Sequence, residues 1–362
     1  MVHLLRVGPG GGDDIASRLE ALLDRSGLAD VFSTGELVAV KMHFGESRVT
    51  GHVRPRFARR LVGWIRKNGG SPFLTDTNTL YRGARADTVS HARAAAEHGF
   101  TFQSVGAPVV IAGGLRGTTQ TVVQFGGELV PEAPIAPEFI KTDSLVSLAH
   151  FKGHEVTGFG GTLKNLGMGC ASRAGKLDMH STTRPYVRPT CIACGVCASW
   201  CPEDAISVGE RAEIDDSKCI GCAECIAVCP EKAVSIRWNE STDTCQMKMV
   251  EYAGAVLASK KGRAGFVNFI TDVHPVCDCY GTEKVPIVGD IGVLVALDPV
   301  AIDQAAYDLV NEATPVSGLS DGYVVGSDKF RDLHPDVDPT VQLRHAEKLG
   351  LGTRDYELVE LE

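Results

Sequence analysis

The feature that most constrains this chain is a cysteine run that occurs twice. The segment CIACGVCASWCP begins at Cys191, and CIGCAECIAVCP begins 28 residues later at Cys219. Both runs have the spacing C-x2-C-x2-C-x3-C-P, so the segment is an internal repeat. Closely spaced thiolates can ligate a shared metal centre, and the backbone that carries them must then wrap around that centre.

The spacing predicts two [4Fe–4S] clusters with interleaved ligands. Three thiolates of one loop reach one cube, and the fourth thiolate, before the proline, reaches the other cube. The first cysteine set is Cys191, Cys194, Cys197 and Cys229. The second cysteine set is Cys219, Cys222, Cys225 and Cys201. The alternative is a pair of zinc knuckles, but zinc takes a single tetrahedral set of four ligands, which the doubled spacing fits poorly.

The segment from Pro185 to Trp238 resembles bacterial two-cluster ferredoxins. This resemblance implies a small α+β unit inserted into a host domain. We therefore expect a first part of the host at residues 1–184, a ferredoxin-like unit at 185–240, and a second part of the host at 241–362. We call residues 185–240 the cysteine-rich unit and the rest the sheet domain.

Outside this unit, short apolar runs alternate with helical patterns, which predicts an α/β fold with a largely parallel sheet. Strands are expected around residues 37–43, 71–76, 107–114, 144–150, 265–272 and 291–297. Helices are expected around residues 13–27, 54–67, 84–100, 246–261 and 298–313. The last helix should begin with Asp298 as its cap and Pro299 in its first turn.

Composition narrows the class of protein. The formal net charge of −9 argues against nucleic acid as a main partner. No apolar run approaches the length that spans a bilayer, so no membrane insertion is expected. The start of the sequence has no signal-peptide pattern, and twelve cysteines then indicate metal or thiol chemistry in a cytoplasmic protein. No pattern specifies an oligomeric state.

Polar side chains follow four of the expected strands. Lys41 and His43 end one strand, Asp76 follows the next, and His150 and His154 follow another. His274, Cys277 and Cys279 follow the fourth. Ligands of open α/β sheets bind beyond the carboxyl ends of strands. We therefore predict a site in which Lys41, His43, His150 and His154 orient a substrate or move protons, although each residue alone could be structural.

A glycine-rich stretch, residues 158–181, precedes the cysteine-rich unit. We expect a loop that approaches an anion or cofactor, because glycines permit close backbone approach. It has no P-loop pattern, and GPGGGDD near the start has no dinucleotide fingerprint. No nicotinamide or flavin cofactor is therefore predicted.

The segment CDC holds Cys277 and Cys279, which the cluster sets do not use. In an extended segment both side chains would lie on one side, and Asp278 would point away. With Cys170 from the glycine-rich stretch, they could bind a third Fe–S cluster or a metal ion. The alternative is a pair of reduced cysteines or a labile disulfide in a tight turn.

Five motifs also resemble an uncharacterised bacterial and archaeal family, a domain of unknown function labelled only as an Fe–S centre protein. They are VKMHFGE, LTDTNTLYRGAR, HFKGHEVTGFGGTLKNLGMGCASRAGK, CDCYG and DIGVLVALDPVAIDQAAYDLVN. The resemblance implies a cytoplasmic Fe–S protein of anaerobes and supplies no reaction.

Two functional hypotheses follow. In the first, the chain is a ferredoxin-dependent oxidoreductase, in which the clusters pass electrons to the strand-end site and on to a redox partner protein or a small-molecule acceptor. In the second, it is a non-catalytic Fe–S carrier, sensor or cofactor-assembly accessory.

Overall fold

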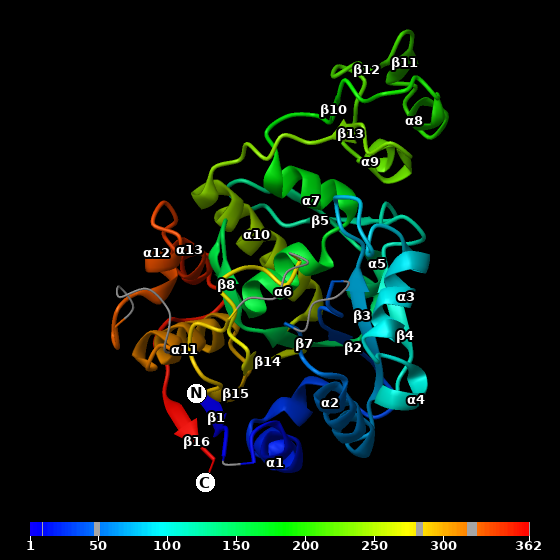
Figure 1. Ribbon diagram of the computed structural model, residues 1–362. Coiled ribbons are helices and arrows are strands. Elements are labelled where there is room, and N and C mark those ends of the chain that lie inside the picture. Colours follow the sequence, from blue (N-terminus) through cyan, green and yellow to red (C-terminus); the bar gives the residue numbers. More distant parts are fainter. Residues whose placement is uncertain (9, 47–50, 280–284, 317–323, 362) are drawn as a thin grey trace.

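The computed structural model describes residues 1–362 except 9, 47–50, 280–284, 317–323 and 362. Its main feature is an eight-stranded sheet with the order β16-β1-β15-β14-β7-β2-β3-β4 (Figure 1). The strands are β1 (Val2–Arg6), β2 (Leu37–Lys41), β3 (Ser71–Thr77), β4 (Val109–Ala112), β7 (Ser144–His150), β14 (Ala264–Ile270), β15 (Gly292–Ala296) and β16 (Leu358–Glu360).

The sheet is largely parallel, as predicted. β14, β7, β2, β3 and β4 pair in parallel, with Ala39 opposite both Leu145 and Phe73. β15 is antiparallel to β14 and to β1, and β16 adds to the edge in parallel with β1. The edge strand β16 and its neighbour β1 are not among the expected elements, because their positions depend on pairing between the two ends of the chain.

Alternation along the strands divides the core between the two faces of the sheet. Val38 and Val40 pack in the cluster that holds Leu19 and Leu61, whereas Ala39 packs in the other cluster. Helices α1 (Gly12–Arg25) and α2 (Pro55–Lys67) lie on the first face, and α6 (Thr162–Cys170), α10 (Thr242–Lys260) and α11 (Pro299–Glu312) lie on the second. The predicted helices are therefore confirmed as the two layers that cover the sheet (Figure 1).

Helix boundaries follow the local signals. The carboxylate of Asp298 accepts hydrogen bonds from the backbone N–H groups of Val300 at 2.8 Å and Ala301 at 2.9 Å, and Pro299 begins α11. The remaining helices of the sheet domain are η1 (Leu28–Val31), α3 (Thr88–Glu97), α4 (Phe102–Val105), α5 (Pro137–Lys141), α7 (Arg173–His180), α12 (Lys329–Leu333) and α13 (Val341–Lys348). Two short hairpins are β5 (Thr121–Gln124) with β6 (Glu132–Ile135), and β8 (Lys152–His154) with β9 (Gly158–Gly160).

The expected glycine-rich loop is wrong in its local structure, because the stretch forms β9, α6 and α7. The carboxylate of Asp303 accepts from the N–H groups of Thr162 at 2.7 Å and Leu163 at 2.8 Å, and so stabilises the start of α6. A Cβ at Gly167 would overlap the carbonyl of Met249, and one at Gly175 would press on Tyr252. These glycines permit close packing of α6 and α7 against α10.

The cysteine-rich unit projects from one end of the molecule (Figure 1). It contains β10 (Tyr186–Val187), α8 (Val196–Ser199), β11 (Ile206–Val208), β12 (Ala212–Ile214), α9 (Glu224–Val228) and β13 (Val234–Ser235). β10 pairs with β13 and β11 pairs with β12, both antiparallel. The repeat in sequence is therefore a repeat of structure, in which each half supplies a loop, a short helix and strands.

None of the helices in the described part of the chain is both long and apolar enough to cross a membrane.

Candidate functional site

The carboxyl ends of β2, β3 and β7 meet at one edge of the sheet and place charged side chains together. Lys41 Nζ lies 2.9 Å from Asp76 Oδ1 and 2.9 Å from Asn165 Oδ1 of α6. Both side chains of the Lys41–Asp76 pair are almost fully buried, at 2% and 5% exposed. A buried ion pair of this kind is retained by complete hydrogen bonding, since losing either partner leaves a buried charge. We call this region the strand-end site.

His43, just beyond β2, offers an unused donor. Its Nδ1 accepts a hydrogen bond from the N–H of Gly45 at 2.8 Å, so in the neutral ring the proton is on Nε2. Nε2 is buried and has no partner among the described residues. Burial lowers the pKa of His43 well below its usual value, and the nearby charges of Arg85 and Lys152 lower it further. His43 is therefore a neutral imidazole whose Nε2–H is free to donate.

Asp278 is a buried anion between His150, the last residue of β7, and Lys152, which follows the strand. Its carboxylate lies 3.0 Å from His150 Nδ1 and 2.9 Å from Lys152 Nζ. The other ring nitrogen of His150 is 2.7 Å from the carbonyl oxygen of Thr271. Burial alone would raise the pKa of Asp278, but His150 and Lys152 hold it far below its usual value. The middle residue of CDC is thus fixed as a carboxylate.

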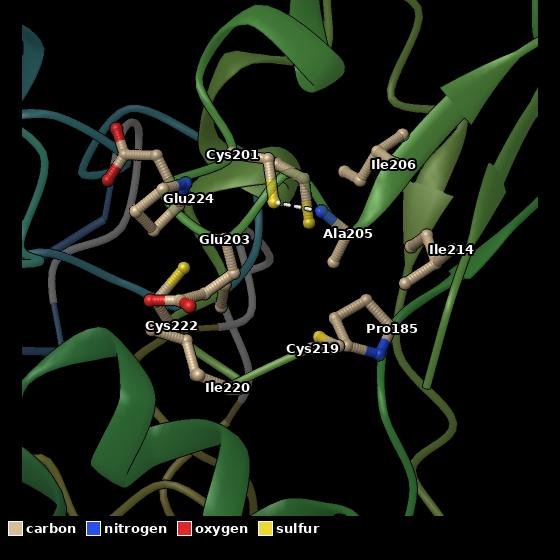
Figure 2. A pocket seen from close by; sticks show the side chains of 13 residues that line it. Pro185, Cys201, Glu203, Ala205, Ile206, Ile214, Cys219, Ile220, Cys222 and Glu224 are labelled. Atoms are coloured by element: carbon tan, nitrogen blue, oxygen red, sulfur yellow. Dashed lines mark hydrogen bonds between the residues drawn. The ribbon is translucent and has the colours of Figure 1, made fainter. Parts of the chain in front are cut away.

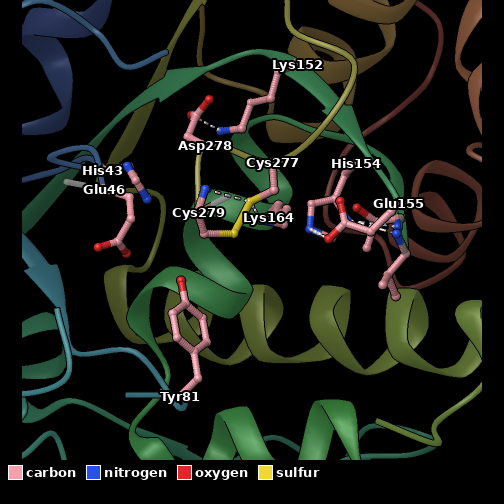
Figure 3. Close-up of a disulfide and its surroundings, with 12 residues drawn as sticks. His43, Glu46, Tyr81, Lys152, His154, Glu155, Lys164, Cys277, Asp278 and Cys279 are labelled. Carbon is pink, nitrogen blue, oxygen red and sulfur yellow. Dashed lines mark hydrogen bonds and ion pairs between the residues drawn. A yellow bond between two sulfur atoms is a disulfide. The ribbon is translucent and has the colours of Figure 1, made fainter. Parts of the chain in front are cut away.

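The two cysteines on either side of Asp278 are bonded to each other as a disulfide (Figure 3). Asp278 points toward Lys152, away from the disulfide, as the alternation of side chains predicts. Lys164 of α6 places Nζ 3.5 Å from Cys277 Sγ. Burial, together with the nearby charge of Lys152, lowers the pKa of Lys164 to about 8.

His154, at the end of β8, flanks the same disulfide (Figure 3). Its Nδ1 accepts from the N–H groups of Val156 and Thr157, each at 3.1 Å, and its Nε2 lies 3.9 Å from Glu155 Oε1. Burial lowers the pKa of His154 well below its usual value, and Lys164 adds to this effect. The four predicted residues Lys41, His43, His150 and His154 therefore all lie at this edge of the sheet.

Sequence reasoning missed a second buried ion network beside them. Arg85 Nε lies 3.0 Å from Glu46 Oε2, and its guanidinium donates to the Tyr81 hydroxyl at 3.1 Å. Arg85 also lies 3.8 Å from Asp76, which joins this network to Lys41. The motif LYRGAR carried the signal, but its charged residues have no regular spacing that marks them as buried.

Cys170, the expected third sulfur of a CDC centre, lies at the buried end of α6. Burial raises the pKa of its thiol to about 12, and the nearest charges are those of Lys41 and Lys176. Throughout the described ranges, no three His, Cys, Asp or Glu side chains form a group placed to hold a metal ion. A third centre on Cys170, Cys277 and Cys279 stays a prediction, and the structure pairs only the latter two.

The eight cysteines of the cysteine-rich unit are divided between two cavities. One is lined by Cys201, Cys219, Cys222 and Cys225 (Figure 2), and the other by Cys191, Cys194, Cys197 and Cys229. The two groups of four have the same members as the two predicted ligand sets, and the binding of clusters by them stays a prediction.

The backbone around these cavities repeats at an interval of 28 residues. Ala193 and Gly195 in the first half, and Gly221 and Ala223 in the second, all have left-handed φ angles between 54° and 76°. Alanine rarely adopts this conformation, which costs about 1 kcal/mol or more and occurs where surroundings demand it. The loops are therefore held open around the cavities.

Backbone donors point at several of the sulfurs. The N–H of Ala205 lies 3.3 Å from Cys201 Sγ (Figure 2), and the N–H of Ala233 lies 3.2 Å from Cys229 Sγ. These two bonds are equivalent in the repeat. A third joins the N–H of Ala212 to Cys191 Sγ at 3.4 Å. Such donors stabilise negative charge on sulfur.

One segment of the sheet domain contacts both regions. Leu80 packs in the same apolar cluster as Cys225 and Cys229. Arg82 donates a hydrogen bond to the carbonyl of Cys229. Between them, Tyr81 lies beside the disulfide and its surroundings (Figure 3). Residues 80–82 therefore connect the cysteine-rich unit to the strand-end site.

These features define an α/β protein with a polar site at its strand ends and a cysteine-rich second unit. The chain belongs to the family described as "Domain of unknown function (DUF362)", whose model matches residues 38–308. That range contains the strand-end site and both cysteine sets, and the predicted membership in an uncharacterised family is confirmed.

No curated protein matches the chain. It is similar to a Thermotoga maritima protein solved by a structural genomics consortium, with 11% identity, a TM-score of 0.37, and coverage of 71% of this chain and 50% of that chain. It is also similar to the lactate racemase apoprotein from Thermoanaerobacterium thermosaccharolyticum, with 14% identity, a TM-score of 0.36, and coverage of 74% and 50%. The chain spans half the length of each.

Proposed function

We propose that the chain is an iron–sulfur electron-transfer protein in which the two cysteine sets hold two [4Fe–4S] clusters that serve the strand-end site. The observation that carries this proposal is the partition of eight cysteines into two cavities with the interleaved membership of a two-cluster ferredoxin. In this role the enzyme class is a ferredoxin-dependent oxidoreductase.

The chemistry of the residues around each cavity supports this proposal, although the thiols as they stand, all in the described part of the chain, are not gathered into a closed metal site. Each cavity offers four cysteines, and the N–H groups of Ala205, Ala212 and Ala233 are placed to stabilise thiolates. Left-handed Ala193 and Ala223 keep the loops open, which is a conformational cost that ligand binding would offset. When bound, each cluster supplies a site that accepts and releases one electron.

The two sets differ in their surroundings, which suggests an order of use. Cys194 of the first set is exposed, whereas a Cβ at Gly221, between two cysteines of the second set, would lie 3.6 Å from Leu177 of the sheet domain. Arg116 also lies 3.6 Å from Glu224, beside Cys225. We expect the exposed side of the first set to receive electrons from a redox partner. Both sets contact the sheet domain, the first through Arg82 at Cys229 and the second through Arg116 at Glu224.

The side chains of the strand-end site would bind and orient the acceptor. His43 presents a neutral Nε2–H, and the cations Lys41, Arg85 and Lys152 surround it. An acceptor with an anionic or carbonyl oxygen would receive a hydrogen bond there and have developing negative charge stabilised. Lys164, whose pKa is lowered to about 8, is placed to exchange protons near neutral pH. His154, whose pKa is lowered well below its usual value by burial, is a neutral ring that would orient the acceptor.

The proposal is tested by anaerobic reoxidation. The dithionite-reduced protein is mixed with each acceptor of a panel, and the rate at which the cluster absorbance recovers is measured. His43→Asn keeps a hydrogen-bond acceptor for the Gly45 N–H and removes the Nε2–H donor. With at least one electron acceptor we expect reoxidation to be roughly tenfold slower or more, because removing one such donor typically lowers a rate by at least this factor. His3→Gln, on the outer strand β1, is the matched control.

Equal rates for the wild-type protein and His43→Asn with every acceptor would contradict a role for the strand-end site. Iron bound without any acceptor-dependent reoxidation would favour the carrier or accessory role.

A further inference from the structure

We infer that the Cys277–Cys279 bond is a reversible two-electron redox site of the sheet domain, in which Cys279 is the sulfur attacked and Cys277 is the sulfur released. This inference deepens the proposed function, because it names the group at the strand-end site that takes the electrons. The chemistry of the disulfide itself does not depend on the clusters.

The bridge contributes little as a structural staple. It joins cysteines two residues apart, and a disulfide that closes so short a loop removes little entropy from the unfolded chain. The segment is already fixed by Asp278, which binds His150 at 3.0 Å and Lys152 at 2.9 Å. Residues that hold the segment without the disulfide leave it free to open and close while its backbone stays in place.

The surroundings distinguish the two sulfurs. Cys277 is buried, and its Sγ faces Lys164 Nζ at 3.5 Å and the N–H of Cys279 at 3.5 Å. Cys279 is only partly buried. Among the described residues, Lys164 makes no ion pair within 4.0 Å, so its charge is available to the sulfur. A thiolate leaving from Cys277 is therefore stabilised, which makes Cys279 the sulfur that a nucleophile or electron donor reaches.

The balance of the step is simple. The Sγ–Sγ bond breaks as it accepts two electrons, and two protons complete the two thiols. Lys164, with a pKa lowered to about 8, can give one of these protons and recover it from solvent. The electron donor is either a dithiol or the two reduced clusters, which together release the two electrons required. Residues 80–82 provide the contact between the donor unit and this site.

The first experiment uses the full chain in anaerobic dithiothreitol buffers of graded redox ratio. Samples are quenched with acid and alkylated, and the peptide with Cys277 and Cys279 is quantified by mass spectrometry. We expect a single reversible two-electron transition, while the buried Cys245 stays unmodified until the chain unfolds. A pair that is fully alkylated at every ratio, or that fails to re-form, would overturn the inference, as would metal released on denaturation only when both cysteines are present.

The second experiment assigns the two sulfurs. Cys279→Ser leaves Cys277 beside Lys164, and Cys277→Ser leaves Cys279 alone. At pH 7 we expect iodoacetamide to alkylate Cys277 about tenfold faster in Cys279→Ser than in the double variant Cys279→Ser/Lys164→Met. This ratio corresponds to a thiol pKa lowered by about one unit by the neighbouring cation. Lys164→Arg should restore the rate, and the exposed Lys67→Met is the control. Equal rates in Lys164→Met and its parent would overturn the assignment of Cys277.

A third experiment separates this inference from the proposed function. In holoprotein reduced with dithionite, we expect the disulfide to open, and in Cys194→Ala we expect it to open more slowly. A chain that binds no iron but shows the reversible dithiothreitol transition would refute the proposed function and leave the disulfide chemistry supported. A chain that binds iron but shows no such transition would overturn the inference about the disulfide and leave the proposed function supported.

Discussion

The cysteine-rich unit and the sheet domain differ in how far apart in the sequence their grouped polar residues and cysteines lie. In the unit, each cavity draws its cysteines from a stretch of fewer than 40 residues, and the backbone repeats through both halves. In the sheet domain, the contacts that matter join residues far apart, such as Lys41 with Asn165 at a separation of 124 and His150 with Asp278 at 128. The grouping of the cysteines can be read from their spacing in the sequence. The contacts of the strand-end site form only when the sheet has folded.

The two regions also differ in what holds them together. The sheet domain has two large apolar clusters, one on each face of the sheet. The apolar cluster of the cysteine-rich unit is small, includes three of the predicted ligand cysteines, and borrows Leu80 and Leu177 from the sheet domain. Units of this size usually need metals or disulfides for stability. The sheet domain should therefore fold without iron, and the unit should not.

The largest expected effect comes from removing one predicted ligand. Cys194 is exposed, so Cys194→Ala loses almost no packing. We expect iron to fall from about eight to about four per chain and the cysteine-rich unit to become sensitive to protease. The sheet domain should keep its melting temperature. Cys245→Ala is the control, and retention of full iron and full protease resistance in Cys194→Ala would break the comparison.

The next effect concerns the buried anion of the strand-end site. Asp278→Asn leaves His150 and Lys152 without a buried counterion, which should cost about 3–5 kcal/mol in the free energy of unfolding of the sheet domain. Urea unfolding of both proteins measures the difference. The control is Asp272→Asn, which breaks an exposed pair with Arg54 and should cost less than about 1 kcal/mol. Similar losses of unfolding free energy in the two variants would show that Asp278 does not act as a buried counterion of His150 and Lys152.

Buried neutral histidines should make the sheet domain less stable as the pH falls. Burial lowers the pKa of His91 to about 3, although Asp76 opposes this, and burial lowers the pKa of His180 to about 3. The unfolded chain binds protons at these rings below about pH 6.5, and the folded chain does not until about pH 3, so the unfolded state gains protons first.

The free energy of unfolding should therefore decrease from pH 6 to pH 4. His91→Gln should reduce that slope by up to about 1.4 kcal/mol per pH unit, the value for one proton. Chemical denaturation at several pH values measures the slope, and a slope that does not change would show that His91 is protonated in the folded protein.

The smallest effect should come from the contact between the two regions. Arg116 lies over the ring of Trp200 at 4.5 Å and beside Glu224 at 3.6 Å. Both contacts are partly exposed, so Arg116→Ala should loosen the cysteine-rich unit by about 1 kcal/mol. Hydrogen exchange of α9 measures this directly. No change in α9 would place the coupling in Leu80 and Leu177 instead.

Much of the fold was predictable because it depends on local patterns. The central strands, the helices that cover them and the cap at Asp298 follow from periodicity and capping residues. The stretch with α6 was misjudged because glycine has two uses, and here Gly167 allows close approach to Met249 and does not mark a loop. The edge strand β16 and its neighbour β1 depend on pairing between the chain ends.

The strand-end site was predictable in outline only. The rule for parallel sheets brought Lys41, His43, His150 and His154 to one edge. It could not show that Asp278 binds His150 and Lys152, that Arg85 binds Glu46, or that Lys164 faces Cys277. These contacts depend on helix packing and join residues far apart in the chain, from 39 positions for Arg85 and Glu46 to 128 for His150 and Asp278, for which spacing carries no signal.

The most direct test of the account is metal analysis of the chain purified without oxygen. Iron, zinc and acid-labile sulfide are counted per chain, and the dithionite-reduced sample is examined by electron paramagnetic resonance. The account predicts about eight irons and about eight sulfides, with the signal of two interacting one-electron centres. About two zinc ions per chain with no sulfide, or a chain without metal that keeps an ordered cysteine-rich unit, would contradict it.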